Sequence, residues 1–414
     1  MTENTRPYGL FKALGIEIEF MIADAANFDI RPEADKLIRS FTGEWSSEFE
    51  NGGASWCNEL VMHLLELKTT TVVSSPAEAL PLFRNEVKTV NERLKDSGAL
   101  LMPGGAHPWM SPKNETKLWP HENREIYEQY DQIFGCRSHG WANLQSMHLN
   151  LPFQSDDDFG RLHAACRVLL PIIPALAAST PILELEHEGF LDFRMEVYRT
   201  NSARIPSMTG DLIPERVFTE SEYRESIFDP LFEELAPFDP ENILSGEWAN
   251  ARGAIARFDR GSIEIRTIDA QESVIANLAV GSAVYHTMQA LTSGPLSDFN
   301  SQSSWEVPPL KAIHEETVRK GGHAVITDRD YISLFGLKEK KISAMELWMG
   351  IMEGLKEECS IEDIFSSPLS FITRNGCLAS RILKVSGVKP KKGLMREISL
   401  EMCRCLAEDR MFTP

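Results

Sequence analysis

GIEIEF, at residues 15–20, alternates acidic with apolar side chains. Strict alternation predicts a half-buried strand, because successive side chains of a strand point to opposite faces of the sheet. We expect the two isoleucines and the phenylalanine to face a core. Glu17 and Glu19 then lie side by side on the other face. Two acids placed in this way are most often a solvated surface, so this stretch alone does not indicate a site.

A second stretch far downstream repeats the pattern. GSIEIRTID, at residues 261–269, places Glu264 and Arg266 on one face of a strand. If the two strands share a sheet, three carboxylates and an arginine gather on one surface. Carboxylates crowded in this way repel one another unless a positive charge lies between them. A hard divalent cation, Mg²⁺ or alternatively Mn²⁺, is the natural candidate because it prefers oxygen ligands.

Composition limits the class of protein. The 414 residues could form one large domain or two or three smaller ones, and 43% hydrophobic with 25% charged residues is typical of a soluble globular chain. A formal charge of −19 argues against binding to nucleic acid or to an anionic membrane. We find no apolar run near the roughly 20 residues that cross a bilayer. Seven scattered cysteines indicate reduced thiols, and hence a cytoplasmic location.

Two further strands contribute candidate ligands. Leu60–Thr71 reads as a strand, with Glu59 before it and Glu66 within it. These two acids are seven positions apart, so both could reach one site only through a bulge or bend. Alternation over Ser146–Leu151 places His148 on a polar face. A single strand histidine is more often structural than a ligand.

The remaining patterns give scaffold elements. Ile255–Phe258 and Ile263–Ile268 form a predicted antiparallel hairpin, with Gly261 where a left-handed residue is needed. SPAE at residues 75–78 predicts a helix start with a capping serine. Residues 294–305 read as a linker, and the chain beyond them reads as helical.

Strands separated by amphipathic helices predict an α+β fold with a curved antiparallel sheet. We expect one polar, metal-lined concave face and helices packed on the other side. Residues 1–295 form the predicted catalytic domain, and residues 296–414 a mainly helical C-terminal region that is either separate or packed on the same domain. The sequence contains no Walker-type loop, no Gly-x-Gly-x-x-Gly, no Gly-x-Ser-x-Gly and no His-Glu-x-x-His. Any nucleotide phosphates would therefore be held by metals on carboxylates.

Seven segments follow the order and approximate spacing of a known family: GIEIEF, NEL…LLELKT, GGAHP, MHLN, LPIIPALAASTP, GFLDFR and IARFDRGSIEIRTID. Over about residues 10–295 the chain resembles the glutamate–cysteine ligase type 2 family, also called carboxylate–amine ligases. The catalytic domain of that family is similar to that of glutamine synthetase. The resemblance implies that ATP phosphorylates a substrate carboxylate, often the γ-carboxylate of glutamate, and that an amine then displaces phosphate to leave an amide.

The resemblance also implies roles for individual residues. The implied metal ligands are Glu17, Glu19, Glu66, Glu264 and His148, with Glu59 as a further ligand through a bend. The implied phosphate and nucleotide contacts are Arg266, Arg257 and His148. The implied substrate contacts are Arg194, Arg199 and His107, with Arg194 suited to a substrate carboxylate. The implied catalytic residues are Glu264, Arg266 and Arg194.

Two departures from the family pattern concern the substrates. The family commonly shows His-Val-His-Val-Gly where this chain has HLNLP at residues 148–152, so Asn150 replaces a second imidazole. Asp192 and Phe193 stand where the family has Ser and Tyr. Glutamate and cysteine are therefore not fixed as the substrates.

Three functions stay open at this point. The leading hypothesis is an ATP- and Mg²⁺-dependent ligase acting on a small carboxylate and an amine, without a nucleic-acid or membrane partner and with a homodimer as one plausible assembly. A second is an ATP-dependent phosphotransferase on the same sheet. A third is a non-catalytic module that binds a nucleotide or an amino acid. Asn150, in place of a second histidine, is consistent with the non-catalytic module. The presence of all four strand carboxylates disfavours it.

Overall fold

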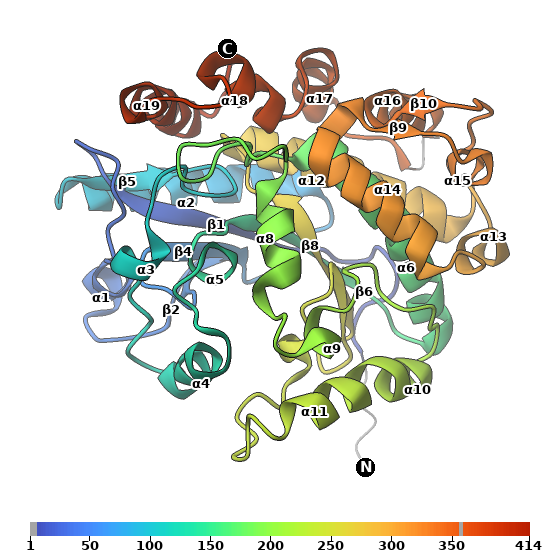
Figure 1. Ribbon diagram of the computed structural model, residues 1–414, viewed down its shortest axis with the longest axis horizontal. Helices are drawn as coiled ribbons and strands as arrows, with labels where there is room; N and C mark the ends of the chain where they lie inside the picture. The colour runs from blue at the N-terminus through green and yellow to red at the C-terminus, as the bar shows by residue number, and fades with distance from the viewer. Residues whose placement is uncertain (1–5, 356–358) are drawn as a thin grey trace.

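The structure is a computed structural model that describes residues 6–355 and 359–414. Its centre is an open eight-stranded sheet with the order β2-β3-β4-β1-β6-β8-β7, and β5 pairs with the end of β1 (Figure 1). Every pairing in the sheet is antiparallel. The strands are β1 Gly15–Asp24, β2 Glu48–Asn51, β3 Ala54–Asn58, β4 Leu64–Thr69, β5 Ala99–Met102, β6 Ser146–Pro152, β7 Ala254–Arg257 and β8 Ser262–Asp269.

The two stretches that suggested a shared sheet lie close to each other in it. β1 and β8 flank β6, so the acid-bearing faces of all three strands are neighbours. Ile16, Ile18 and Phe20 are fully buried on the opposite face, as the alternation predicts. The predicted hairpin is present as β7 and β8, and Gly261 in its turn has φ of 66°. That positive φ favours glycine, which has no Cβ to clash with the backbone.

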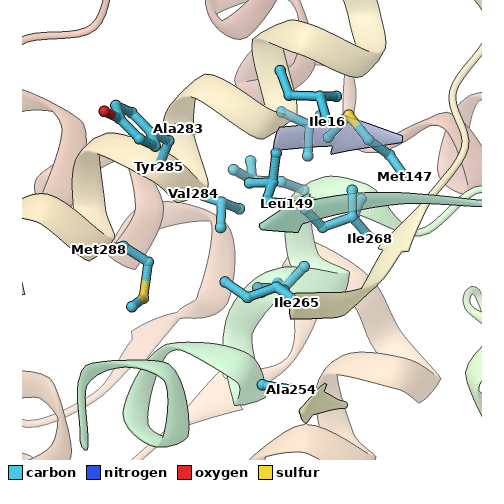
Figure 2. Packing of buried hydrophobic residues seen from close by; sticks show 14 of the residues in the cluster. Ile16, Met147, Leu149, Ala254, Ile265, Ile268, Ala283, Val284, Tyr285 and Met288 are labelled. Carbon is cyan, nitrogen blue, oxygen red and sulfur yellow. The ribbon is translucent and has the colours of Figure 1, made fainter. Parts of the chain in front are cut away.

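Helices cover the apolar face of the sheet. They are α2 Pro76–Lys95, α6 Asp156–Leu169, η1 Leu170–Ile172, α7 Ile173–Ala177 and α12 Val274–Ser293. Ser75 caps α2 by accepting a hydrogen bond from the Glu78 N–H, as predicted. Figure 2 shows Val284 of α12 beside Leu149 of the sheet, and Met288 and Ile265 belong to the same apolar cluster. This packing fixes the sheet and leaves its other face for the acids.

One prediction about apolar segments was wrong. Asp156–Ala177, which runs through α6, η1 and α7, is long and apolar enough to cross a membrane by length and composition. The most apolar stretch of this segment is 94% buried inside the protein, and core helices commonly have this length and composition. The apolarity of the segment therefore reflects its burial between the sheet and the neighbouring helices.

Shorter segments surround the polar side of the sheet. They are α1 Ala34–Thr42, α3 Pro112–Glu115, α4 Arg124–Phe134, α5 His139–Ala142, α8 Phe193–Asn201, α9 Pro206–Thr209, α10 Glu220–Tyr223, η2 Arg224–Phe228, α11 Asp229–Leu235 and η3 Glu247–Ala249. In Figure 1, α8 crosses in front of β8. Several of these segments line the cavity described below.

The C-terminal region contributes to the main core. It comprises α13 Phe299–Ser303, α14 Val307–Lys320, η4 Gly321–His323, β9 Val325–Ile326, α15 Arg329–Ser333, β10 Ile342–Ser343, α16 Ala344–Gly354, α17 Asp363–Asn375, α18 Leu378–Ser386 and α19 Lys392–Glu408. α14 packs on η1 and α17 on α12, while α16 to α19 lie along the upper edge of Figure 1. Arg381 of α18 forms a fully buried ion pair with Glu272. The division at residue 295 stays a prediction.

Candidate active site

A cavity of about 740 Å³ lies over the polar face of the sheet. Its floor comes from β1, β4, β6, β7 and β8, and its walls come from the segments that surround that face. Most of the predicted site residues line it: Glu17, Glu19, Glu59, Glu66, His148, Arg194, Arg257, Glu264 and Arg266. Asn150 lines it as well. The structure therefore brings these side chains together, while the role of each stays a prediction.

Strand register places the acids side by side. Glu17 lies opposite His148 on one neighbouring strand and opposite Lys68 on the other. Glu19 lies opposite Glu66. Two groups result in which one potential ligand atom from each member lies within 4.8 Å of the others: Glu17 with Glu66 and His148, and Glu19 with Glu59 and Glu66. Glu66 belongs to both groups.

Glu59 reaches this centre through a break in the strand. The prediction of one strand over Leu60–Thr71 was wrong, because β3 ends at Asn58 and β4 begins at Leu64. The Leu64 N–H donates to the Val61 carbonyl at 3.2 Å, which closes a tight turn between them. This turn supplies the bend that a joint site of Glu59 and Glu66 requires.

On one side of the carboxylate cluster, the charge of Glu17 is neutralised by neighbouring side chains. His148 Nδ1 lies 3.0 Å from Glu17 Oε2, and Asn150 Nδ2 donates to Glu17 Oε1 at 3.0 Å. Burial acts to raise the pKa of Glu17, but the hydrogen bond and charge of His148 and the charge of Arg266 lower it to about 2. Burial acts to lower the pKa of His148, but the hydrogen bond and charge of Glu17 hold it above its ordinary value. Glu17 and His148 therefore form an ion pair.

On the other side of the cluster, burial and neighbouring carboxylates outweigh the charges of His148 and Lys68. Burial, followed by the charges of Glu19 and Glu17, raises the pKa of Glu59 to about 8. Burial and the charges of Glu17 and Glu59 raise the pKa of Glu66 well above its ordinary value. Oxygen ligands that oppose one another's ionisation fit a divalent cation, because the ion removes their repulsion. The residues present therefore suit Mg²⁺ or Mn²⁺. A bound ion would favour the deprotonated forms of Glu59 and Glu66.

Glu264 lies on the cationic side of the cavity. Its Oε1 accepts from Arg266 Nε at 2.6 Å, and its Oε2 lies 3.8 Å from Arg257 Nη1. Arg257 is also held by Asp259, at 2.9 and 3.1 Å. A β-bulge between β6 and β8 lies at this level and re-aims the side chains of β8. The two guanidinium groups can hold phosphate oxygens, whereas Glu264 as a metal ligand stays a prediction.

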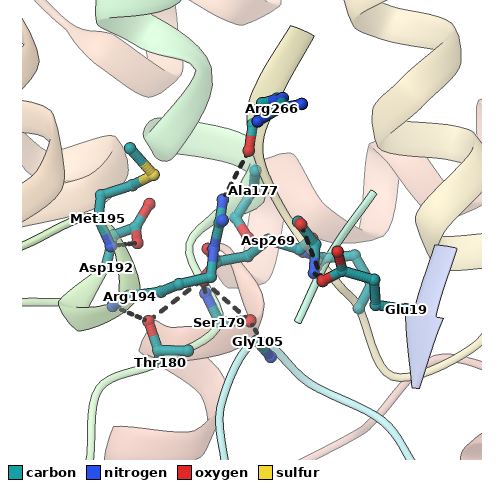
Figure 3. Close-up of polar contacts among 12 residues, drawn as sticks. Glu19, Gly105, Ala177, Ser179, Thr180, Asp192, Arg194, Met195, Arg266 and Asp269 are labelled. Atoms are coloured by element: carbon teal, nitrogen blue, oxygen red, sulfur yellow. Dashed lines mark hydrogen bonds and ion pairs between the residues drawn. The ribbon is translucent and has the colours of Figure 1, made fainter. Parts of the chain in front are cut away.

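Arg194 lines the cavity and is paired with the fully buried Asp269 (Figure 3). Its Nε donates to Asp269, and its Nη2 donates to the Arg266 carbonyl at 3.2 Å. Asp269 also accepts from the Ser179 N–H at 2.8 Å and from the Thr180 hydroxyl at 3.2 Å. This network fixes the start of α8 against the end of β8, so the Arg194 guanidinium is held rigidly beside the cavity.

Asp192 is a second buried acid behind Arg194. Its Oδ1 caps α8 by accepting from the Met195 N–H at 2.9 Å. Burial and the nearby charge of Asp269 raise the pKa of Asp192 well above its ordinary value. The raised pKa of Asp192 favours its protonated form, while Asp269 forms the ion pair with Arg194.

Two predicted substrate residues do not line the cavity. His107 is fully buried: its Nε2 lies 2.7 Å from the Phe28 carbonyl, and its Nδ1 accepts from the Met110 N–H at 3.0 Å. Burial lowers its pKa to about 4. Arg199 pairs with Glu196 at 2.7 Å and is 45% exposed. Five residues along α8 rotate its side chain about 140° away from that of Arg194, because each helical residue turns about 100°.

The sequence analysis missed several residues that line the cavity. Ser146 donates to Glu19 at 3.0 Å and lies 2.8 Å from His148 Nε2. Lys68 lies two residues after Glu66 on the same face, so strand alternation could have identified both. The aromatic lining residues come from segments without a clear periodic pattern, and no local signal marked them: Tyr127, Tyr130, Trp141, Tyr198 and Trp248.

Comparison with known sequences places this arrangement in context. The profile of Glutamate-cysteine ligase family 2 (GCS2) matches residues 13–384. An uncharacterised protein of Archaeoglobus fulgidus is 33% identical over 354 residues, which are 83% of this chain and 94% of that protein. A protein of Nocardioides sp., provisionally named glutamate--cysteine ligase 2-1, is 25% identical over 206 residues. That match spans 48% of this chain and only 50% of the named relative.

One solved structure shares the architecture. Glutamate–cysteine ligase from Francisella tularensis, in complex with AMP, superposes with a TM-score of 0.59 at 12% identity. The match covers 96% of this chain and 88% of that one. The likeness confirms the predicted α+β fold with a large antiparallel sheet.

Proposed function

The chain belongs to glutamate-cysteine ligase family 2, and from that premise we propose that it joins a carboxylate to an amine in an ATP- and Mg²⁺-dependent reaction. It is an ATP-dependent ligase of the glutamate–cysteine ligase type. We propose further that the bond is an amide, γ-glutamyl if the carboxylate belongs to glutamate, and that it forms through an acyl phosphate.

The observation that carries the proposal is the juxtaposition of two kinds of charge in one cavity. Glu66 belongs to both groups of potential ligands, and within each group the ligand atoms lie within 4.8 Å of one another. Arg266 and Arg257 lie on the same face, around Glu264. Phosphoryl transfer requires charge neutralisation on the phosphate and alignment of the acceptor, rather than a protein nucleophile. Carboxylates for a cation next to arginines for a phosphate meet that requirement.

The residues divide the work as follows. Glu17, Glu19, Glu59, Glu66 and His148 would hold the cation, which when bound neutralises phosphate oxygens. Arg266 and Arg257 would bind the phosphate group during transfer, and Arg194 would bind a substrate carboxylate. The carboxylate attacks the γ-phosphorus and ADP leaves. The amine then attacks the acyl carbon, loses a proton and displaces phosphate.

The test is Mg²⁺-dependent turnover of ATP across a panel of amino acids and amines, including glutamate with cysteine. The proposal expects ADP and phosphate to rise together with a new product of amide mass. Failure of every pair, together with failure of Mg-ATP to bind in calorimetry, would contradict it.

Hydroxylamine distinguishes the ligase from a phosphotransferase on the same sheet. An acyl phosphate reacts with hydroxylamine to give a hydroxamate, whereas a stable phosphorylated product does not. Hydroxamate formation that requires ATP, Mg²⁺ and the carboxylate supports the ligase.

A further inference from the structure

The cavity has two chemically different ends, with the carboxylates between them. β8 runs from Ser262, which pairs with Arg257 at the hairpin, to Asp269, which pairs with Ser146. The hairpin end is cationic, since Arg257 and Arg260 both line it. The other end, which we call the inner end, lies where Asp269 holds Arg194.

An aromatic wall runs along one side of the cavity, from the inner end toward the hairpin. It consists of Tyr127 and Tyr130 from α4, Trp141 from α5, Tyr198 from α8 and Trp248 from η3. Tyr130 packs between the two tryptophans, with ring centroids 5.1 Å from Trp141 and 6.1 Å from Trp248. Four of the five rings are only half-buried, and Tyr130 alone is buried. Apolar surface therefore remains uncovered inside the cavity.

The rings are held in fixed positions. Trp141 Nε1 donates to the Asn201 carbonyl at 3.0 Å, and the Tyr127 hydroxyl accepts from Asn58 Nδ2 at 2.8 Å. Burial raises the pKa of both Tyr127 and Tyr130, which keeps these phenols neutral. The wall is thus a rigid, uncharged surface rather than an acid–base site.

The helical segments that carry the wall contribute one charged side chain to the cavity, while Arg266 of β8 lies near Tyr198 and Tyr130, and Glu59 lies near Tyr127. Among the described lining residues from α4, α5, α8, α9 and η3, Arg194 alone carries a formal charge. The Arg194 Nε donates a hydrogen bond to Asp269, and the Arg194 Nη2 donates one to the Arg266 carbonyl. The rest of the guanidinium fork suits a carboxylate. The inner end therefore combines an anion site with a broad apolar surface.

We propose that the inner end binds the amine co-substrate, and that this co-substrate is an α-amino acid with a large apolar or aromatic side chain. Its carboxylate pairs with Arg194, its side chain covers the aromatic wall, and its amine points to the carboxylate centre. A side chain as small as that of cysteine would leave most of the wall uncovered, and apolar burial contributes about 25 cal/mol per Å². The role as amine donor to the amide rests on the proposed function, whereas the binding preference does not.

Tryptophan fluorescence tests the preference directly. Trp141 and Trp248 lie on the wall, so we expect phenylalanine or leucine to change the emission and to bind at least tenfold more tightly than alanine. A single methylene in an apolar pocket changes discrimination by about ten- to two-hundredfold. 3-Phenylpropionate should bind, and 2-phenylethylamine, which lacks the carboxylate, should bind at least tenfold more weakly.

Matched variants assign the signal to the wall. W141F and W248F should each reduce the emission change, whereas W45F should retain it because Trp45 is an exposed residue stacked on His121. Equal affinities for alanine and phenylalanine, or a full signal in both wall variants, would overturn the inference. If hydroxamate forms without such a preference, the inference fails and the ligase stands. If the preference appears without any ATP turnover, the proposed function fails and the binding site stands.

Discussion

Glu66→Gln is the perturbation whose outcome the structure determines most fully. Glu66 is the one residue shared by the two described groups of ligand atoms. Two ionised carboxylates at the 4.8 Å limit of those groups repel by about 3.5 kcal/mol at an effective dielectric constant of about 20. The protein avoids this repulsion by protonation, as the strongly raised pKa of Glu66 indicates.

Glutamine has the shape of a protonated glutamate, so the metal-free variant should match the stability of the wild type below about pH 4.5, within about 1 kcal/mol. At higher pH it should be more stable than the wild type. The reason is the pKa of Glu66 itself, which burial and the charges of Glu17 and Glu59 hold well above its ordinary value of 4.5. A carboxyl with a raised folded-state pKa favours folding below its ordinary value and loses that contribution as pH rises through the folded value. The wild type should therefore lose stability as the pH rises above about 4.5, and the variant should lose less.

With Mg²⁺ bound, the wild type should be more stable than the Glu66→Gln variant. A ligand at a hundred times its Kd stabilises a fold by about 2.7 kcal/mol, and the variant lacks the carboxylate common to both groups. Thermal unfolding with and without saturating MgCl₂ measures this difference. Glu50→Gln, on the exposed side of β2, serves as the matched control and should keep the full Mg²⁺ effect. The reasoning is refuted if Glu66→Gln keeps the same Mg²⁺-induced rise in unfolding temperature as the wild type.

Three further substitutions have defined outcomes. Glu264→Gln should lower kcat at least about a hundredfold with circular dichroism unchanged, because Arg266 and Arg257 lose the carboxylate that orients them; full activity would contradict this. Asp269→Asn should cost about 3–5 kcal/mol of unfolding free energy, because it breaks a buried ion pair, and should raise the KM for the carboxylate-bearing amine more than it lowers kcat. An unchanged KM would show that Arg194 does not bind this substrate. His107→Gln should cost about 1–3 kcal/mol through its lost buried hydrogen bonds without changing any KM, and a raised KM at unchanged stability would restore His107 as a substrate contact.

The strands that carry the acids were predictable because their signal is local. β1 and the β7–β8 hairpin follow from alternation and from one glycine turn, and seven short segments were enough to indicate the family, which the profile match confirms. The polar face could be assembled from these pieces, since antiparallel neighbours bring alternating residues of one face together.

The rest depends on contacts between distant segments. Glu59 meets Glu66 through a turn that interrupts the expected strand, and nothing in the local pattern favoured that turn. The aromatic wall draws on α4, α5, α8 and η3, whose spacing in the chain gives no periodic pattern. The sequence alone did not show that His107 lies outside the cavity, because a histidine in a tight glycine-rich turn fits a ligand and a buried hydrogen-bonding role equally well, and only burial distinguishes them.

The most direct test of the central claim follows the oxygen atoms of the carboxylate substrate. Both of these oxygens are labelled with ¹⁸O, and the inorganic phosphate released during amide formation is analysed by mass spectrometry. The account predicts one ¹⁸O atom per phosphate, because the carboxylate oxygen that attacks the γ-phosphorus leaves with it when the amine attacks the carbonyl. Label in AMP, or phosphate without label, would contradict an acyl phosphate.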